Sequence, residues 1–170
     1  MHSTDKIAIL MATYNGEKYI CQQIDSILSQ TCKDWELYIH DDGSTDNTIA
    51  ALESYVEKYP NKIHLIDGKS TGGAKYNFFY LFGQVEAPYY MTCDQDDVWK
   101  KNKMREIERV FEDPKVMAVV HDAQIVDEKL SSLDQTTFEW RNSGTGFWKN
   151  MKKNSYIGCC MAVRRSAMKR

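Results

Sequence analysis

A run of apolar residues near the N-terminus places the strongest limit on the fold. Residues 7–12 read Ile-Ala-Ile-Leu-Met-Ala, and this run is too short for a typical helix. An unbroken apolar run of this length suits a strand buried on both faces inside a parallel sheet. The turn-forming residues Thr13-Tyr14-Asn15-Gly16 follow, and apolar residues then recur at helical spacing. The chain therefore opens with a predicted strand, loop and helix.

The same unit recurs along the chain. Further strands are predicted at residues 35–40, 63–66, 89–93 and 116–120, with helical spacing of apolar residues between the first four strands and after the fourth. Residues 128–154 are largely polar without clear periodicity, and a strand-like run returns at 157–163. This alternation predicts an α/β fold whose central sheet is mostly parallel, with helices on both faces.

Composition limits the size and the partners of the chain. A length of 170 residues predicts one domain over residues 1–170, and a net charge of -2 argues against a nucleic acid partner. The five cysteines form no CxxC pair, which favours a reducing compartment. No apolar stretch is long enough to span a bilayer, and residues 1–6 lack the apolar core of a signal peptide. We expect a cytoplasmic protein without a transmembrane segment in this chain.

An acidic run, Cys93-Asp94-Gln95-Asp96-Asp97-Val98-Trp99, closes the fourth predicted strand. Carboxylates this close repel one another unless a cation neutralises them, and hard oxygen ligands favour Mg²⁺ or Mn²⁺. In an extended chain Asp94 and Asp96 share one side, while Asp97 faces away unless the chain turns there. The alternative is a solvated turn in which Asp96 or Asp97 caps the next helix.

A second acidic pair, Asp41-Asp42, ends the second predicted strand and also precedes a helix. A carboxylate at this position can accept a hydrogen bond from the imide nitrogen of uracil or thymine, a proton that cytosine lacks. The alternative is a turn and helix cap formed by Asp42, Ser44 and Asp46.

Four further residues are weaker candidates for the same site. Tyr14, after the first strand, could stack on a base or ribose, and Lys75, near the start of an aromatic helix, could meet a diphosphate. His121 and Asp122 end the fifth predicted strand and could orient a substrate. For a histidine at a strand end, local hydrogen bonding is the more common role.

These motifs, taken in order, resemble glycosyltransferase family 2, whose nucleotide-binding α/β sandwich is called GT-A. The resemblance rests on residues 11–16 after the first strand, 41–46 after the second and 93–99 after the fourth. It implies transfer of a sugar from a nucleoside diphosphate donor to a glycan or lipid-linked acceptor, in polysaccharide biosynthesis and with inversion. It also implies a protein of the cytoplasm or of the inner face of the membrane.

The resemblance also implies roles for individual residues. Ala12 and Tyr14 would line the nucleoside pocket, Asp42 would read the base, and Asp94 and Asp96 would hold the ribose and the metal, with Asp97 sharing this work. The segments Asp94–Trp99, Gly72–Phe78 and His121–Ala123 look most like the rhamnosyltransferase branch of the family. That branch implies a dTDP-sugar donor, with a UDP-sugar as the other choice.

The chain departs from the family pattern in two places. Ala12 stands where the family often has proline, next to the base pocket. The family's general base, an Asp or Glu that deprotonates the acceptor hydroxyl, would follow the strand-like run at residues 157–163, and no residue up to Arg170 matches it. The expectation is therefore a C-terminally incomplete GT-A domain, with the general base beyond Arg170.

Two other functions compete with a glycosyltransferase. In a haloacid dehalogenase-type phosphohydrolase, Asp94 would be the phosphoryl-accepting nucleophile of Asp94-Gln95-Asp96-Asp97-Val98. That family has its motif on the first strand, whereas here three predicted strand–helix units come before it. The second alternative is a non-catalytic module that binds a nucleotide sugar.

Overall fold

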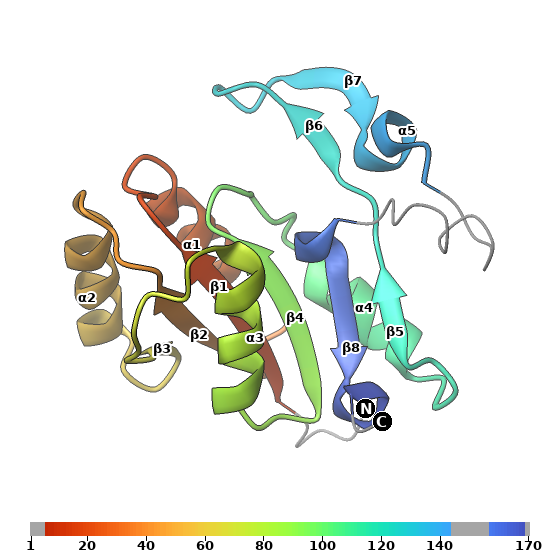
Figure 1. Cartoon of the computed structure of the whole chain (residues 1–170). Helices are drawn as coiled ribbons and strands as arrows, with labels where there is room; N and C mark the ends of the chain where they lie inside the picture. Colours follow the sequence, from red (N-terminus) through yellow and green to blue (C-terminus); the bar gives the residue numbers. More distant parts are fainter. Residues whose placement is uncertain (1–5, 144–156, 169–170) are drawn as a thin grey trace. The chain divides into compact units, whose positions relative to one another are not determined.

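The structure is a computed structural model that describes residues 6–143 and 157–168 (Figure 1). Residues 1–5, on which the expectation about a signal peptide rests, lie outside the described residues. So do residues 144–156, which belong to the polar segment, and residues 169–170. The chain divides into two compact units: residues 1–119 with 162–170, and residues 120–161.

The first unit contains the predicted central sheet. Its strands have the spatial order β3-β2-β1-β4-β8-β5, and β1, β2, β3 and β4 run parallel while β8 is antiparallel to β4. Their bounds are β1 Ile7–Thr13, β2 Trp35–Asp41, β3 Ile63–Leu65, β4 Tyr89–Asp94, β5 Ala118–Val120 and β8 Met161–Arg164. The α/β fold with a mostly parallel sheet is therefore confirmed.

Helices cover both faces of this sheet, as the apolar first strand predicted. Ile7, Ile9 and Met11 of β1 pack in one apolar cluster with residues of α1, α2 and α4. Ala8 and Leu10, which point the other way, pack with α3, which crosses that face in Figure 1. The helices are α1 Ile20–Leu28, α2 Thr48–Lys58, α3 Ala74–Gln84 and α4 Lys103–Phe111. Among the described residues, no helix has the length and apolar character needed to cross a membrane.

The second unit contains structure that the sequence did not predict. A two-stranded antiparallel sheet and a short helix occupy part of the segment read as polar and irregular: β6 Gln124–Val126, β7 Ser132–Thr136 and α5 Thr137–Arg141. Most β6 and β7 side chains are exposed, so neither strand shows apolar alternation. Polar bonds order the segment instead, since Asp127 accepts the Ser131 amide at 2.8 Å and Thr136 begins α5 with a capping box.

Two predicted strands have different bounds in the structure. The run at residues 157–163 begins with a 3₁₀ turn, Gly158–Cys160, and becomes a strand only at Met161. The fifth strand begins at Ala118 rather than at residue 116. Arg164 holds this corner of the sheet, because its Nε donates to the Val116 carbonyl at 2.6 Å and its Nη1 to the Tyr89 hydroxyl at 2.7 Å. Such side chain–backbone bonds have no periodic signature in a sequence.

Glu36 on β2 has a carboxylate whose pKa lies well below its usual value. Burial raises this pKa, but hydrogen bonds from Lys6, Tyr38 and His64 outweigh burial and hold it at about 2. The folded state therefore gains stability from the ionised group above its ordinary pKa of 4.5 and loses that gain as the pH falls toward 2.

Replacing Glu36 with glutamine is expected to lower the free energy of unfolding at pH 7. It should also flatten the fall of that free energy between pH 4.5 and 2, the range in which the unfolded wild-type chain binds a proton at Glu36 and the folded protein largely does not. Urea denaturation at several pH values measures both effects. Parallel curves for the two proteins would contradict the prediction.

Candidate functional site

A cavity of about 560 Å³ lies at the carboxyl ends of β1, β2 and β4, the edge at which open α/β sheets bind ligands. Among the described residues, those that line it all belong to the first unit and come from the ends of these strands, the loops after them, the loop before α3 and the first turns of that helix. Its lining residues are Ala12, Thr13, Tyr14, Asp42, Ser70, Gly72, Gly73, Ala74, Asn77, Asp94, Gln95 and Asp96. The cavity therefore brings together Ala12, Tyr14, Asp42, Asp94 and Asp96, which the sequence singled out.

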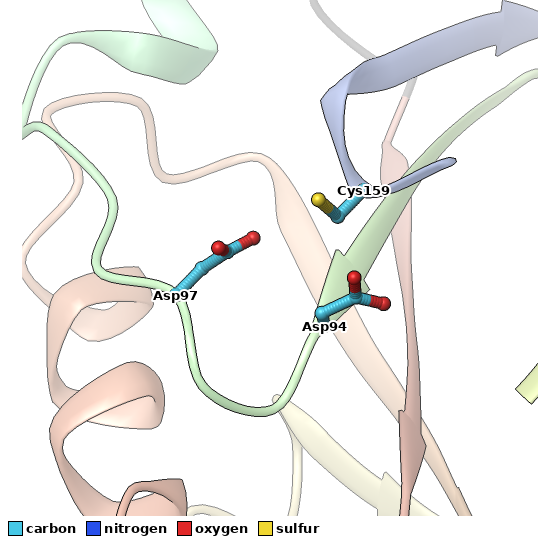
Figure 2. A group of neighbouring side chains, drawn as sticks. All are labelled: Asp94, Asp97 and Cys159. Atoms are coloured by element: carbon cyan, nitrogen blue, oxygen red, sulfur yellow. The ribbon is translucent and has the colours of Figure 1, made fainter. Parts of the chain in front are cut away.

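The carboxylates of the acidic run gather at the end of β4. Asp94 is the last residue of that strand and pairs in register with Ala12 of β1. The chain turns at Gln95 and Asp96, and this turn brings Asp97 back to the side of Asp94. Oxygens of Asp94 and Asp97 lie within 4.8 Å of each other, and Figure 2 shows their side chains pointing toward a common space.

These carboxylates suit a hard divalent cation, since oxygen atoms are the ligands that Mg²⁺ and Mn²⁺ prefer. Asp96 is exposed and lines the cavity, while Asp97 does not appear among the lining residues. The structure therefore places Asp97 next to Asp94. Alternation along an extended strand would have pointed Asp97 to the opposite side. Cys159, also labelled in Figure 2, is a buried residue of the second unit.

Hydrogen bonds to α1 and to Gln30, just beyond the end of this helix, hold the loop that follows the acidic run. The Ser26 hydroxyl accepts the Trp99 amide at 2.9 Å, and the Gln30 side chain donates to the Lys100 carbonyl at 2.8 Å. The Gln30 Oε1 atom also accepts the Met104 amide at 3.2 Å. The buried side chains of Ser26 and Gln30 fix the path of the chain directly after the acidic residues.

Asp41, the last residue of β2, and Asp42, which follows it, make different contacts. Asp41 forms a local turn, because its carboxylate accepts the amides of Gly43 and Ser44 at 2.9 and 2.7 Å. Asp42 is only 8% exposed, and it lines the cavity. The turn after β2 is thus formed by Asp41, whereas the sequence had offered Asp42 for it, and the role of Asp42 at the site stays a prediction.

Asp42 is held by the loop that precedes α3. Its carboxylate accepts the Thr71 amide, the Thr71 hydroxyl at 2.8 Å and the Gly73 amide at 2.8 Å. Burial raises the pKa of Asp42, but these bonds and one from the Gly72 amide outweigh burial and lower it. Gly72 and Gly73 have φ values of 84° and 144°, in the region where glycine is favoured. A negative charge is therefore fixed on the cavity wall at neutral pH.

Gln95 and Asn77 line the cavity, although the sequence analysis gave neither residue a role in the site. The Gln95 side chain pairs with the backbone of Tyr14, which is itself 56% exposed. Asn77 of α3 is buried, donates to the His40 carbonyl at 2.9 Å and shares a 2.9 Å bond with His40 Nδ1. Both residues lie inside segments that carry the resemblance, Asp94–Trp99 and Gly72–Phe78, but nothing in the spacing of those segments assigns either residue a role.

Lys75 does not line the cavity. Its ammonium group lies 5.8 Å from the ring centre of Tyr76 and 5.9 Å from that of Phe79, in the range of cation–π contacts on the same helix. The positive end of α3 does face the cavity, because Gly73 and Ala74 at the start of the helix are lining residues. A role for Lys75 at a diphosphate stays a prediction.

His121 and Asp122 belong to the second unit, where both make local bonds. The Asp122 carboxylate accepts the Thr137 hydroxyl at 2.8 Å and the Phe138 amide at 2.9 Å, and so holds the start of α5. Burial raises the pKa of Asp122, but these bonds outweigh burial and lower it. His121 Nδ1 lies 3.0 Å from the Asp122 carbonyl. Their role in orienting a substrate stays a prediction.

The sequence matches a family model described as glycosyl transferase family 2 over residues 8–170. An uncharacterized glycosyltransferase of Nostoc is 35% identical over 133 residues, which are 78% of this chain and 41% of that protein. The dTDP-rhamnosyl transferase RfbG of Shigella flexneri is 40% identical over 99 residues, covering 56% of this chain and 34% of that protein. The chain thus spans less than half the length of these relatives.

Solved structures share the fold. The mannosyltransferase PcManGT of Pyrobaculum calidifontis, in complex with GDP-Man and Mn²⁺, matches 99% of this chain and 47% of its own with a TM-score of 0.70 and 17% identity. S. aureus TarS 1–349 in complex with UDP-GlcNAc matches 96% of this chain and 46% of its own, with a TM-score of 0.67 and 22% identity. At these identities the likeness concerns the fold alone.

Proposed function

The chain belongs to glycosyl transferase family 2, and on this basis we propose that its cavity binds a nucleoside diphosphate sugar together with a divalent cation. The whole protein would transfer the sugar, with inversion, to a glycan or lipid-linked acceptor. The observation that carries the proposal is the cavity itself. It joins a base-reading carboxylate, an acidic cluster and a helix N-terminus in one volume of about 560 Å³, within the size range of small-molecule sites.

The acidic run supplies the cation site of the proposal. Asp94 and Asp96 are its ligands, and Asp97 stands near enough to Asp94 to share the ion. A bound Mn²⁺ or Mg²⁺ would neutralise charge on the departing nucleoside diphosphate. The N-terminus of α3, at Gly73 and Ala74, offers a second source of positive potential for the same diphosphate.

Asp42 is the base-reading group of the proposal. The Asp42 carboxylate already accepts hydrogen bonds from Thr71, Gly72 and Gly73, so in the proposal a donor on the base would share or replace one of these bonds. The imide N–H of uracil or thymine is such a donor, whereas cytosine presents an acceptor at the same ring position. Tyr14, exposed on the cavity wall, provides an aromatic surface for the base or the ribose.

The donor sugar, the general base and the location of the protein are further parts of the proposal. A dTDP-linked donor, with rhamnose as the sugar, rests on the similarity to RfbG. As the family resemblance implies, the general base that takes the acceptor proton would lie outside the residues that line the cavity. A location in the cytoplasm or at the inner face of the membrane accords with five free cysteines. Family membership leaves the dehalogenase-type alternative without support.

Calorimetric titration with UDP, dTDP and CDP tests the proposal. In the presence of Mn²⁺ we expect UDP and dTDP to bind saturably and CDP to bind about tenfold more weakly, the size of one lost hydrogen bond to a charged group. Removing the metal with EDTA should greatly weaken UDP binding, and adding Mg²⁺ or Mn²⁺ back shows which ion restores it. UDP binding that is equally tight in EDTA would refute the cation site, and equal affinities for UDP and CDP would refute the role of Asp42.

A further inference from the structure

We infer that Gln95 is a positioning residue, which clamps the Tyr14 loop to the acidic run and so holds the two walls of the cavity at a set separation. Its relevance to ligand binding rests on the proposed function. The clamp itself is a feature of the ligand-free fold and can be tested without any nucleotide.

One side-chain amide makes both bonds of the clamp. The Tyr14 amide donates to Gln95 Oε1 at 3.0 Å, and Gln95 Nε2 donates to the Tyr14 carbonyl at 3.0 Å. Donor faces acceptor in both, as in the pairing of two strands. The two residues are 81 positions apart, and both line the cavity.

Gly16 leaves the space that the Gln95 side chain fills. A Cβ atom at Gly16 would lie 2.3 Å from Gln95 Oε1 and 2.6 Å from Gln95 Cδ, far inside van der Waals contact. Its backbone φ lies outside the left-handed region, so an alanine at this position meets no backbone strain. An alanine at this position would instead push the Gln95 amide out of its place beside Tyr14.

The clamp completes the anchoring of this loop. On its other side, the loop is bonded to the chain after β2: the Asn15 amide donates to the Ser44 hydroxyl at 2.7 Å, and Asn15 Oδ1 accepts the Thr45 amide at 2.8 Å. The exposed Tyr14 ring has little packing of its own, so its place in the cavity depends on the backbone. Gln95 thereby sets where that ring stands relative to the acidic run, which reduces the ordering required when a ligand binds.

The first experiment measures exchange of the Tyr14 amide hydrogen by NMR in the ligand-free protein. We expect protection in the wild type and faster exchange in both Gln95→Ala and Gly16→Ala, because the first variant deletes the acceptor and the second displaces it. The backbone amide of the residue at position 16, which donates to Thr48 Oγ1 at 2.8 Å, should stay protected in all three proteins. Matched controls are Gln22→Ala, an exposed glutamine on α1, and Gly83→Ala, a glycine of α3 with open space around it. Equal Tyr14 exchange in wild type and both variants would overturn the clamp.

The second experiment titrates the same proteins with UDP and Mn²⁺. Gln95→Ala and Gly16→Ala should each weaken binding about tenfold, the scale of ordering a loop side chain on binding. The double variant should be no weaker than the single ones, because both changes remove one clamp. Wild-type affinity in Gln95→Ala, or additive losses in the double variant, would overturn the inference. A wild-type protein that binds no UDP would instead overturn the proposed function, and the exchange experiment would still decide whether the clamp exists.

Discussion

Asp96→Ala is expected to abolish Mn²⁺-supported binding of UDP while leaving the protein folded. Asp96 is an exposed cavity residue, so its removal opens no hole in the core. It also relieves repulsion with Asp94 and Asp97, which favours the ligand-free fold. With one ligand of the cation lost, the affinity for UDP should fall at least about a hundredfold, or about 2.7 kcal/mol. Calorimetry with Mn²⁺ measures the loss, and thermal unfolding checks the fold.

The matched control is Asp34→Ala, which removes an exposed aspartate just before β2, at the opposite edge of the sheet. This variant should bind UDP as the wild type does. Asp97→Ala completes the series, since Asp97 has an oxygen within 4.8 Å of one on Asp94. If Asp96→Ala kept its affinity and Asp97→Ala lost it, the cation would belong to Asp94 and Asp97, and our assignment of Asp96 would be wrong.

Asp42→Ala is expected to have the second largest effect, because it removes a base-reading group and a loop anchor together. The affinity for UDP should fall by about tenfold or more, and that for CDP should hardly change, so that the preference for UDP disappears. The donors on Thr71 and Gly73 also lose a buried acceptor, which should lower the free energy of unfolding by about 1–3 kcal/mol. Calorimetry with the two nucleotides and urea denaturation measure these effects.

The neighbouring Asp41 provides the control for this prediction. Asp41→Ala breaks the turn at Gly43 and Ser44, so it should lower stability while the preference for UDP over CDP persists. Asp42→Asn is a third variant, in which the side chain can both donate and accept and should therefore bind UDP and CDP alike. A normal UDP preference in Asp42→Ala would show that another residue reads the base.

Most of the first unit could be predicted because its elements have strong periodic signals. Residues 7–12 are apolar without interruption because both faces of β1 are covered, and helical spacing in α1 and α4 reflects one buried stripe on each. The second unit had no such signal. Side chains of β6 and β7 are mostly exposed, and the turn at Asp127 and the start of α5 depend on polar bonds rather than on apolar spacing.

The sequence predicted where the candidate site lies, but it predicted only some of the residues that line it. Parallel strands bring their carboxyl ends to one edge, so Tyr14, Asp42 and Asp94 were expected to lie close together from their positions after β1, β2 and β4. Asn77 and Gln95 line the same cavity, but no spacing or periodicity in the sequence assigns them a role there. Their places depend on bonds with His40 and Tyr14, which are distant in sequence.

The sequence by itself determined the order of strands and helices, the double burial of β1 and the edge at which acidic residues gather, because these follow from local periodicity and from the geometry of parallel strands. Only the tertiary structure showed that the Thr71–Gly73 loop holds Asp42 in the cavity wall while Asp41 forms a turn, and that a turn after Asp94 brings Asp97 close to it. It also revealed the pairing of Gln95 with Tyr14. These outcomes depend on hydrogen bonds between loops far apart in the chain, whose partners meet only when the sheet has assembled in register.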